Sequence, residues 1–119
     1  MTQLLAARQL ILEALEAAGI RSATTQRFSA PCVHVEPGDP WTEPARLPGR
    51  TSRWRLTALA GRTDSEGAYL ALAELIDQTD TALRSIPGCQ LPSWSKPADY
   101  VIGEQTHAGS VATVTLATS

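Results

Sequence analysis

The sequence contains few of the residues from which metal centres, redox sites and membrane spans are built. Its 119 residues include two cysteines and two histidines. No apolar run approaches the roughly 20 residues that cross a bilayer. Only Cys32 and His34 lie close together, and a separation of one residue does not match the ligand spacing of structural zinc sites. We therefore expect no metal ion, no cofactor and no membrane partner.

Catalytic motifs are missing as well. The chain has no G-x-S-x-G motif, no recognisable cysteine–histidine signature and no glycine-rich phosphate loop. The carboxylates Glu36, Asp39 and Glu43 lie in a loop-like segment that is unsuited to holding two carboxyl groups at a fixed separation. The sequence predicts that the protein is not an enzyme. A small α+β enzyme stays an alternative, and it would require a pocket with shifted pKa values.

The charge lacks the basic excess expected of a dedicated nucleic-acid-binding protein, because the net charge is −2. Arginines nevertheless gather in one part of the chain, with two tryptophans among them: Arg46, Arg50, Arg53, Arg55 and Arg62, with Trp41 and Trp54. A small nucleic-acid-binding α+β domain is therefore an alternative function. An acidic protein surface is an equally good partner for these arginines.

Apolar residues are plentiful enough for one core. Hydrophobic residues make up 43% of the chain and charged residues 18%, which is typical of a globular protein, and we expect a single domain over residues 1–119. Arg8 and Glu13 interrupt the early apolar run, so a signal peptide is not predicted and synthesis in the cytoplasm is expected.

Two segments have the apolar spacing of helices. The first covers Thr2–Ala18, and the Gly19-Ile20 pair after it fits a left-handed stop followed by a hydrophobic contact. The second begins at a capping box formed by Thr63 and Glu66 and ends before Pro87-Gly88, with an acidic outer face. The predicted buried positions are Leu4, Leu5, Ile11, Leu12, Leu15 and Ala18, then Tyr69, Leu72, Ala73, Ile76, Leu83 and Ile86.

Four segments read as strands: Val33–Val35, Thr51–Ala60, Tyr100–Ile102 and Val111–Leu116. In the second, Trp54 and Leu56 alternate with Arg53 and Arg55, so one face is predicted to be buried and the other polar. The last two form a hairpin whose turn is predicted within residues 105–110, with Gly109 available for positive φ. We predict an α+β fold, a two-layer sandwich in which two helices cover one face of a mainly antiparallel sheet of about four strands. The other face is expected to be polar or to meet another subunit.

A long proline-rich segment follows the first predicted strand. Residues 36–50 contain four of the eight prolines and one of the three tryptophans. We predict that residues 37–50 form an extended loop with no secondary structure of its own, stiffened by its prolines and used to grip another molecule. Two interpretations of Trp41 stay open, namely packing onto its own domain or anchoring an intermolecular contact. The candidate interface residues are Trp41, Arg46, Leu47, Arg50, Arg53 and Arg55.

Taken together, these elements resemble the tail terminator proteins of long-tailed, siphovirus-type bacteriophages. The resemblance covers nearly the whole chain and rests on the order, length and texture of the elements. Its features are the opening helix over 4–18 with Gly19-Ile20, the strand over 33–37, the strand over 53–58, the helix over 63–86 and the hairpin over 98–116.

The resemblance implies a structural virion protein of the tail–neck region. Such proteins form a hexameric ring that caps the tail tube, terminates tube polymerisation and joins the tail to the head–tail connector. The implied partners are further copies of the chain, the major tail tube protein and the connector or stopper protein, while DNA only passes through the channel. Another neck protein, of the head-completion or stopper type, is the nearest alternative. An arginine-lined face and an acidic helix face on one chain would suit copies that meet head to tail.

Overall fold

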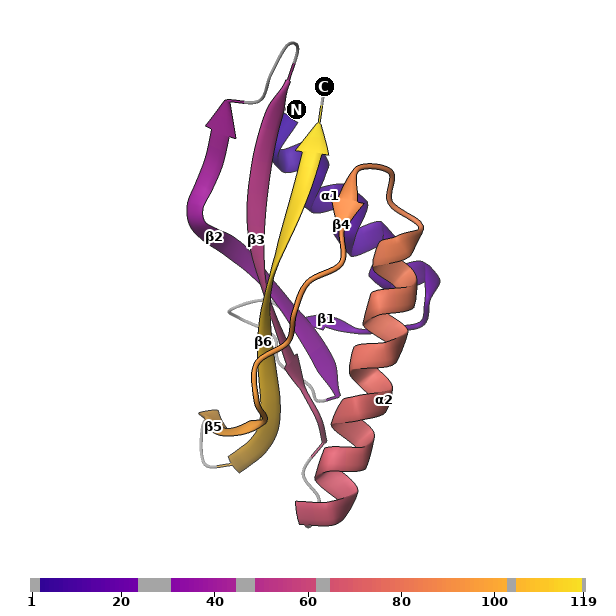
Figure 1. Cartoon of the computed structure of the whole chain (residues 1–119). Helices are drawn as coiled ribbons and strands as arrows, with labels where there is room; N and C mark the ends of the chain where they lie inside the picture. The colour runs from indigo at the N-terminus through magenta and orange to yellow at the C-terminus, as the bar shows by residue number, and fades with distance from the viewer. Residues whose placement is uncertain (1–2, 24–30, 45–48, 62–64, 103–104, 119) are drawn as a thin grey trace.

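A mainly antiparallel sheet runs along the molecule and carries two helices (Figure 1). The computed structural model describes residues 3–23, 31–44, 49–61, 65–102 and 105–118. The helices are α1 (Gln3–Ala17) and α2 (Ser65–Arg84). The strands are β1 (Ser22–Ala23), β2 (Cys32–Pro44), β3 (Arg50–Leu59), β4 (Cys89–Gln90), β5 (Ala98–Ile102) and β6 (Gln105–Thr118).

Within these residues the strands form one six-stranded sheet in the order β1-β2-β3-β6-β4, with β5 also paired to β6. Only the β1–β2 pair is parallel. The predicted α+β class, with two helices and a mainly antiparallel sheet, is confirmed. Two two-residue strands, β1 and β4, extend the sheet beyond the four strands that the residue pattern predicted.

The main core lies between both helices and one face of the sheet. Alternate side chains of β3, including Trp54 and Leu56, are buried there against Ile11 and Leu15 of α1 and Leu72 of α2. The prediction that Trp54 and Leu56 point inward is confirmed. No helix of the described residues joins the opposite face.

The opposite sheet face is polar along its middle, as predicted. Arg55 pairs in register with Thr113, and Arg53 pairs with Thr115, so these side chains share that face. A small apolar cluster lies at one end of the face and consists of Cys32, Leu59 and Tyr100.

Helix α1 ends as its sequence predicts. Gly19 has φ +77°, its N–H donates to the carbonyl of Glu16 at 3.0 Å, and the N–H of Ile20 donates to the carbonyl of Leu15 at 2.9 Å. These are the two bonds of a Schellman motif, and Ile20 supplies its buried apolar contact. The predicted buried stripe was too wide, because Leu5 is 49% exposed. Ala18 is exposed as well.

The stripe predicted for the second helix is confirmed in part, because Leu72, Leu83 and Ile86 are buried and Ile76 is partly buried against the core. The other two predicted positions differ, since Tyr69 is 55% exposed and Ala73 is also exposed. The buried positions of α2 are Ala68, Leu72, Leu75, Thr79, Ala82 and Leu83, and Ile86 follows them in the core. Thr79 is tolerated inside because its Oγ1 donates to the Leu75 carbonyl at 2.7 Å. The predicted capping residue Thr63 lies outside the described residues.

Residues 36–50 (the first proline segment) contain the predicted loop over 37–50, and their described part is strand up to Pro44 and again at Arg50. Strand β2 continues to Pro44, and its pairing with β3 resumes at Thr42↔Ser52 after a register shift between Pro37 and Thr42. The Asp39–Pro40 peptide in this interval is cis. The loop prediction was therefore wrong over residues 37–44. Prolines are compatible with β2 because it lies near the edge of the sheet, where a missing N–H need not interrupt the ladder.

Residues 90–97 (the second proline segment) also follow a sheet edge. Strand β4 pairs with β6 at Cys89↔Leu116 and Gln90↔Thr115, and Trp94 forms an isolated bridge with Ala112 further along β6. The chain then enters β5, which pairs with the first residues of β6. Prolines break this edge into short pairings because they cannot donate to the ladder.

The closing β5–β6 hairpin is confirmed, but its predicted turn was misplaced. Residues 105–110 are strand, and Ile102 pairs with Gln105. Gly109 lies inside β6, and it is not one of the positive-φ glycines of the described residues. A Cβ at Gly109 would lie 2.5 Å from Cδ2 of Tyr100 and 2.9 Å from Cδ2 of Leu59. Close packing, and not a turn, therefore requires glycine at this position.

Candidate assembly interface

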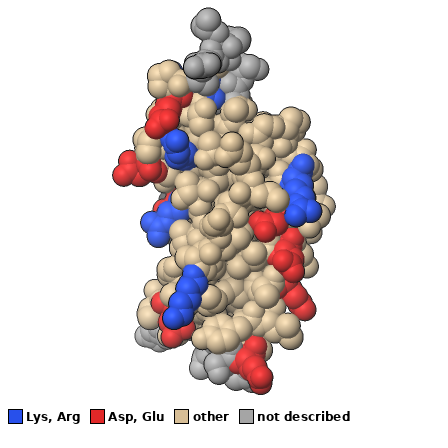
Figure 2. Space-filling model, in the orientation of Figure 1, with Lys and Arg blue, Asp and Glu red and all other residues tan. Residues whose placement is uncertain are grey.

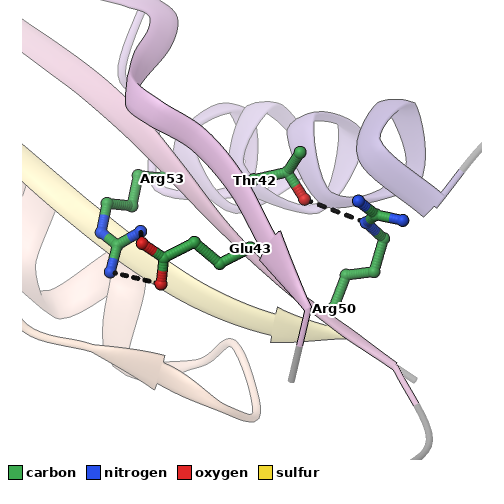
Figure 3. Close-up of polar contacts among 4 residues, drawn as sticks. All are labelled: Thr42, Glu43, Arg50 and Arg53. Atoms are coloured by element: carbon green, nitrogen blue, oxygen red, sulfur yellow. Dashed lines mark hydrogen bonds and ion pairs between the residues drawn. The ribbon is translucent and has the colours of Figure 1, made fainter.

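The arginines predicted at the interface are engaged in pairs across the β2–β3 hairpin. Arg53 and Glu43 form a two-pronged contact, with Nη1–Oε1 at 3.2 Å and an Nη2–Oε2 hydrogen bond at 3.3 Å (Figure 3). On the same two strands, Arg50 Nε of β3 donates to Thr42 Oγ1 of β2 at 3.0 Å (Figure 3). Arg53 and Glu43 thus neutralise one another on the surface of the sheet.

A third pair continues the pattern along the same strands. Arg55 Nε lies 3.5 Å from Glu36 Oε1, and the two residues are direct partners in the β2–β3 register. Opposite charges facing each other across neighbouring strands stabilise the pairing by a few tenths of a kcal/mol to about 1 kcal/mol. Figure 2 shows basic and acidic side chains close together along one flank of the molecule.

These pairs show how two of the clustered arginines are placed. Arg53 and Arg55 each face a carboxylate, so their charges are compensated within the hairpin, while Arg46 and Arg62 lie outside the described residues. The acidic flank does exist, because α2 carries Glu66, Glu74, Asp77 and Asp80. Asp80 is partly committed, since its Oδ1 accepts a 2.9 Å hydrogen bond from Trp94 Nε1.

Trp41 packs onto its own domain. Its ring meets that of Trp54 edge to face, with centroids 5.7 Å apart and an interplanar angle of 89°. Trp54 is 1% exposed and its Nε1 donates to Ser52 Oγ at 3.0 Å, so it is a fixed platform. Trp41 remains 40% exposed. The packed interpretation of Trp41 is therefore the observed one, and part of its ring still faces solvent.

The hairpin brings together most of the predicted interface residues. Trp41, Arg50, Arg53 and Arg55 all lie on β2 and β3. Arg46 and Leu47 lie outside the described residues. Gly38 explains the close approach of the two strands, because a Cβ there would lie 3.0 Å from the Arg53 backbone carbonyl carbon and oxygen.

Sequence reasoning missed the surface on the other side of the sheet. Val101 of β5 is 70% exposed and Leu91 of the second proline segment is 43% exposed. Val101 is paired with β6, and Leu91 lies between the β4 pairs and the Trp94 bridge on the same side of β6. The available signal was the absence of proline between Ala98 and Ile102, in contrast to the proline-rich first segment.

The described residues offer little for catalysis. They contain no group of three or more potential metal ligands. A depression of about 520 Å³ has Glu66, Gly67, Tyr69 and Leu70 among its lining residues, and another of about 300 Å³ has Ala18, Asp77, Gln78 and Thr81. Neither set of side chains pairs a nucleophile with an imidazole base. Burial raises the pKa of the Cys89 thiol, which disfavours the reactive thiolate.

Comparison with known proteins leaves the resemblance to phage proteins as an expectation. No protein-family model matches the chain, and no curated protein matches it in sequence. Among the helices described, none is both long enough and apolar enough to cross a membrane.

Proposed function

We propose that this protein is a tail terminator of a siphovirus-type bacteriophage, a structural subunit that forms a hexameric ring on the end of the tail tube. In this role the ring stops tube polymerisation and then joins the tail to the head–tail connector. The ring surrounds the channel through which DNA passes, and the protein belongs to the tail–neck region of the virion.

The observation that carries the proposal is the arrangement of the elements. The chain runs from α1 through the β2–β3 hairpin to α2 and then to the β5–β6 hairpin, which is the order that the resemblance implies. Both helices pack on one face of the sheet, and in the described residues the other face carries paired charges and threonines. Such a chain leaves a sheet face and sheet edges for partners, as a ring subunit requires.

The first proline segment is the assembly element in this proposal. The two-layer sandwich forms the body, and the β2–β3 hairpin carries the half-exposed Trp41 and ends at the same end of the molecule as the start of α1 and the end of β6 (Figure 1). Side chains on this hairpin are already oriented by cross-strand pairs, which lowers the entropy lost on contact with a neighbour or with the tube.

The test is the native mass of the purified chain, measured alone and with the major tail tube protein. We expect a ring of six copies, either free or on the tube, and tubes that stop growing when further tube subunits are added. Electron microscopy of tube lengths measures that arrest. A chain that stays monomeric at high concentration and leaves tube growth unchanged contradicts the proposal. The gene order separates the alternative neck proteins, since a terminator gene is expected directly before the major tube gene.

A further inference from the structure

We infer that copies of this chain join edge to edge, with the outer edge of β5 in one copy pairing with the outer edge of β2 in the next. The inference rests on the ring of the proposed function and identifies the surface through which neighbours meet. It follows from which backbone groups the two edge strands direct away from their own sheet.

Among the residues that the structure describes, no strand pairs with the outer edge of β2 from Val35 to Pro44. Within the same residues, β1 pairs with Val33 and His34, and the Val33 N–H donates outward to the Arg21 carbonyl at 2.9 Å. Because backbone groups alternate along a strand, Val35 and Pro37 share that outward direction. The β3–β6 register is unbroken, so the backbone N–H and carbonyl of Thr51 point toward β2. Those of its partner Glu43 therefore point toward β3. The backbone groups of Thr42 and Pro44, on either side of Glu43, point outward.

The β5 edge is open on the side away from β6. The N–H of Ser95 donates to the Val111 carbonyl at 2.8 Å, so Val111 directs its backbone groups toward this side. By the same alternation, Gly109 and His107 face their β5 partners Ala98 and Tyr100. The backbone N–H and carbonyl groups of Asp99 and Val101 therefore point outward, and no strand of the described residues pairs with them.

Prolines make the two edges unlike. Two of the four outward positions of β2, Pro37 and Pro44, offer a carbonyl and no N–H, so two β2 edges would offer one another only half of these donors. Both outward positions of β5, Asp99 and Val101, offer an N–H. An acceptor-rich edge facing an edge that retains its donors favours the unlike contact over the β2–β2 contact.

The strand directions also agree with a closed ring. Strands β2, β3, β6 and β5 alternate in direction, so the two edges run in opposite senses. Rotation about an axis along the strands preserves direction, and β5 of one copy then meets β2 of the next as an antiparallel pair. The outward residues on both edges place their side chains on the helix-covered face, since Val35 and Ala108, the register partner of Asp99, belong to the main core. Helices of neighbouring copies therefore lie on the same side of a continuous sheet.

Exposed apolar side chains mark both edges. Val101 is 70% exposed on β5, and Trp41 is 40% exposed on β2. A neighbour at each edge removes part of this apolar surface from water, which supports the hydrogen bonds of the strand pair. The occupant of each edge is therefore a second copy of this chain.

The experiment breaks one edge at a time in the full chain. Val101→Pro removes an outward donor from β5, and Thr42→Pro removes one from β2, while Val101→Thr and Thr42→Val keep the N–H groups and serve as matched controls. Each variant is checked for the parent's circular dichroism and unfolding midpoint. The native mass is then measured alone, in an equal mixture of the two proline variants, and with tube protein.

We expect both controls to assemble like the parent and each proline variant to be monomeric. Their mixture forms a dimer and nothing larger, because it contains one intact pair of unlike edges. Dimers of Thr42→Pro alone indicate β5–β5 pairing and overturn the inference, as does unchanged assembly of either proline variant. If a variant does not fold, amide exchange in the parent decides: slower exchange at Val35 and Asp99 in the assembly than in the free chain supports the inference, and equal rates overturn it.

The inference and the proposed function fail separately. Edge-paired copies that do not arrest tube growth keep the inference and remove the function. Rings that arrest tube growth, but in which the amides of the two edges exchange as fast as in the free chain, keep the function and remove the inference. A parent chain that never self-associates overturns the inference, while its capping of tubes would keep the function.

Discussion

The two proline-rich segments lie on opposite edges of one sheet and are held there in different ways. In the first segment, residues 36–44 join β3 through a long backbone ladder interrupted by one register shift, and the Arg53–Glu43 contact lies near the surface. Residues 90–97 have short pairings with β6, and half-buried side-chain bonds fix them. In the second segment, side-chain hydrogen bonds thus hold the chain where backbone hydrogen bonds to β6 are missing. Substitutions should therefore cost more stability in the second segment than in the first.

Trp94→Ala is the largest expected effect. The ring of Trp94 packs against the main core, and its Nε1 donates to Asp80 Oδ1 at 2.9 Å. Loss of the ring and of the donor should lower the free energy of unfolding by about 2–4 kcal/mol. Urea unfolding at constant m-value measures it, and Trp94→Phe, which keeps an aromatic ring, should cost only about 1 kcal/mol. Equal costs for the two variants would show that packing of the ring adds nothing beyond the bond to Asp80, because both variants lose that bond.

Trp41→Ala tests the first segment in the same way. Trp41 contacts Trp54 edge to face but keeps 40% of its surface exposed, so the loss should be about 1–2 kcal/mol. Trp41→Phe is the matched control, and it should recover most of that loss because a ring still faces Trp54. The same urea titration applies. If Trp41→Ala proves more damaging than Trp94→Ala, the contrast between the two segments is wrong.

The fold followed from the sequence where local rules act alone. The Gly19-Ile20 stop, the inward Trp54 and the closing hairpin were predicted because backbone geometry and period-two burial depend on near neighbours. The β2 extension was missed because four prolines read as a loop, while an edge strand tolerates them when a long partner lies beside it. Gly109 was assigned to a turn because the sequence does not show that the ring of Tyr100 lies against this position.

The sequence predicted which residues belong to the candidate site but not how their charges are paired. It grouped Trp41, Arg53 and Arg55 as candidate interface residues, and the structure places them on one hairpin. Their pairing with carboxylates depends on the register between β2 and β3, which a proline-rich segment conceals. The β5 edge was missed because outward backbone groups carry no side-chain signature. Edges therefore have to be read from the pairing of strands.

The smallest expected effect is the coupling between Arg53 and Glu43. Arg53 Nη1 is buried and lies 3.2 Å from Glu43 Oε1 without hydrogen-bond geometry, while the rest of both side chains is partly exposed. A double-mutant cycle with Arg53→Ala and Glu43→Ala should give a coupling energy of about 0.5–1 kcal/mol that shrinks in high salt, as expected for a partly exposed ion pair. The Arg55–Glu36 pair is the control, because at 3.5 Å and with greater exposure of the arginine it should couple less. A coupling for Arg53 that exceeds the cost of Trp94→Ala would show that side chains, and not the ladder, hold the first segment in place.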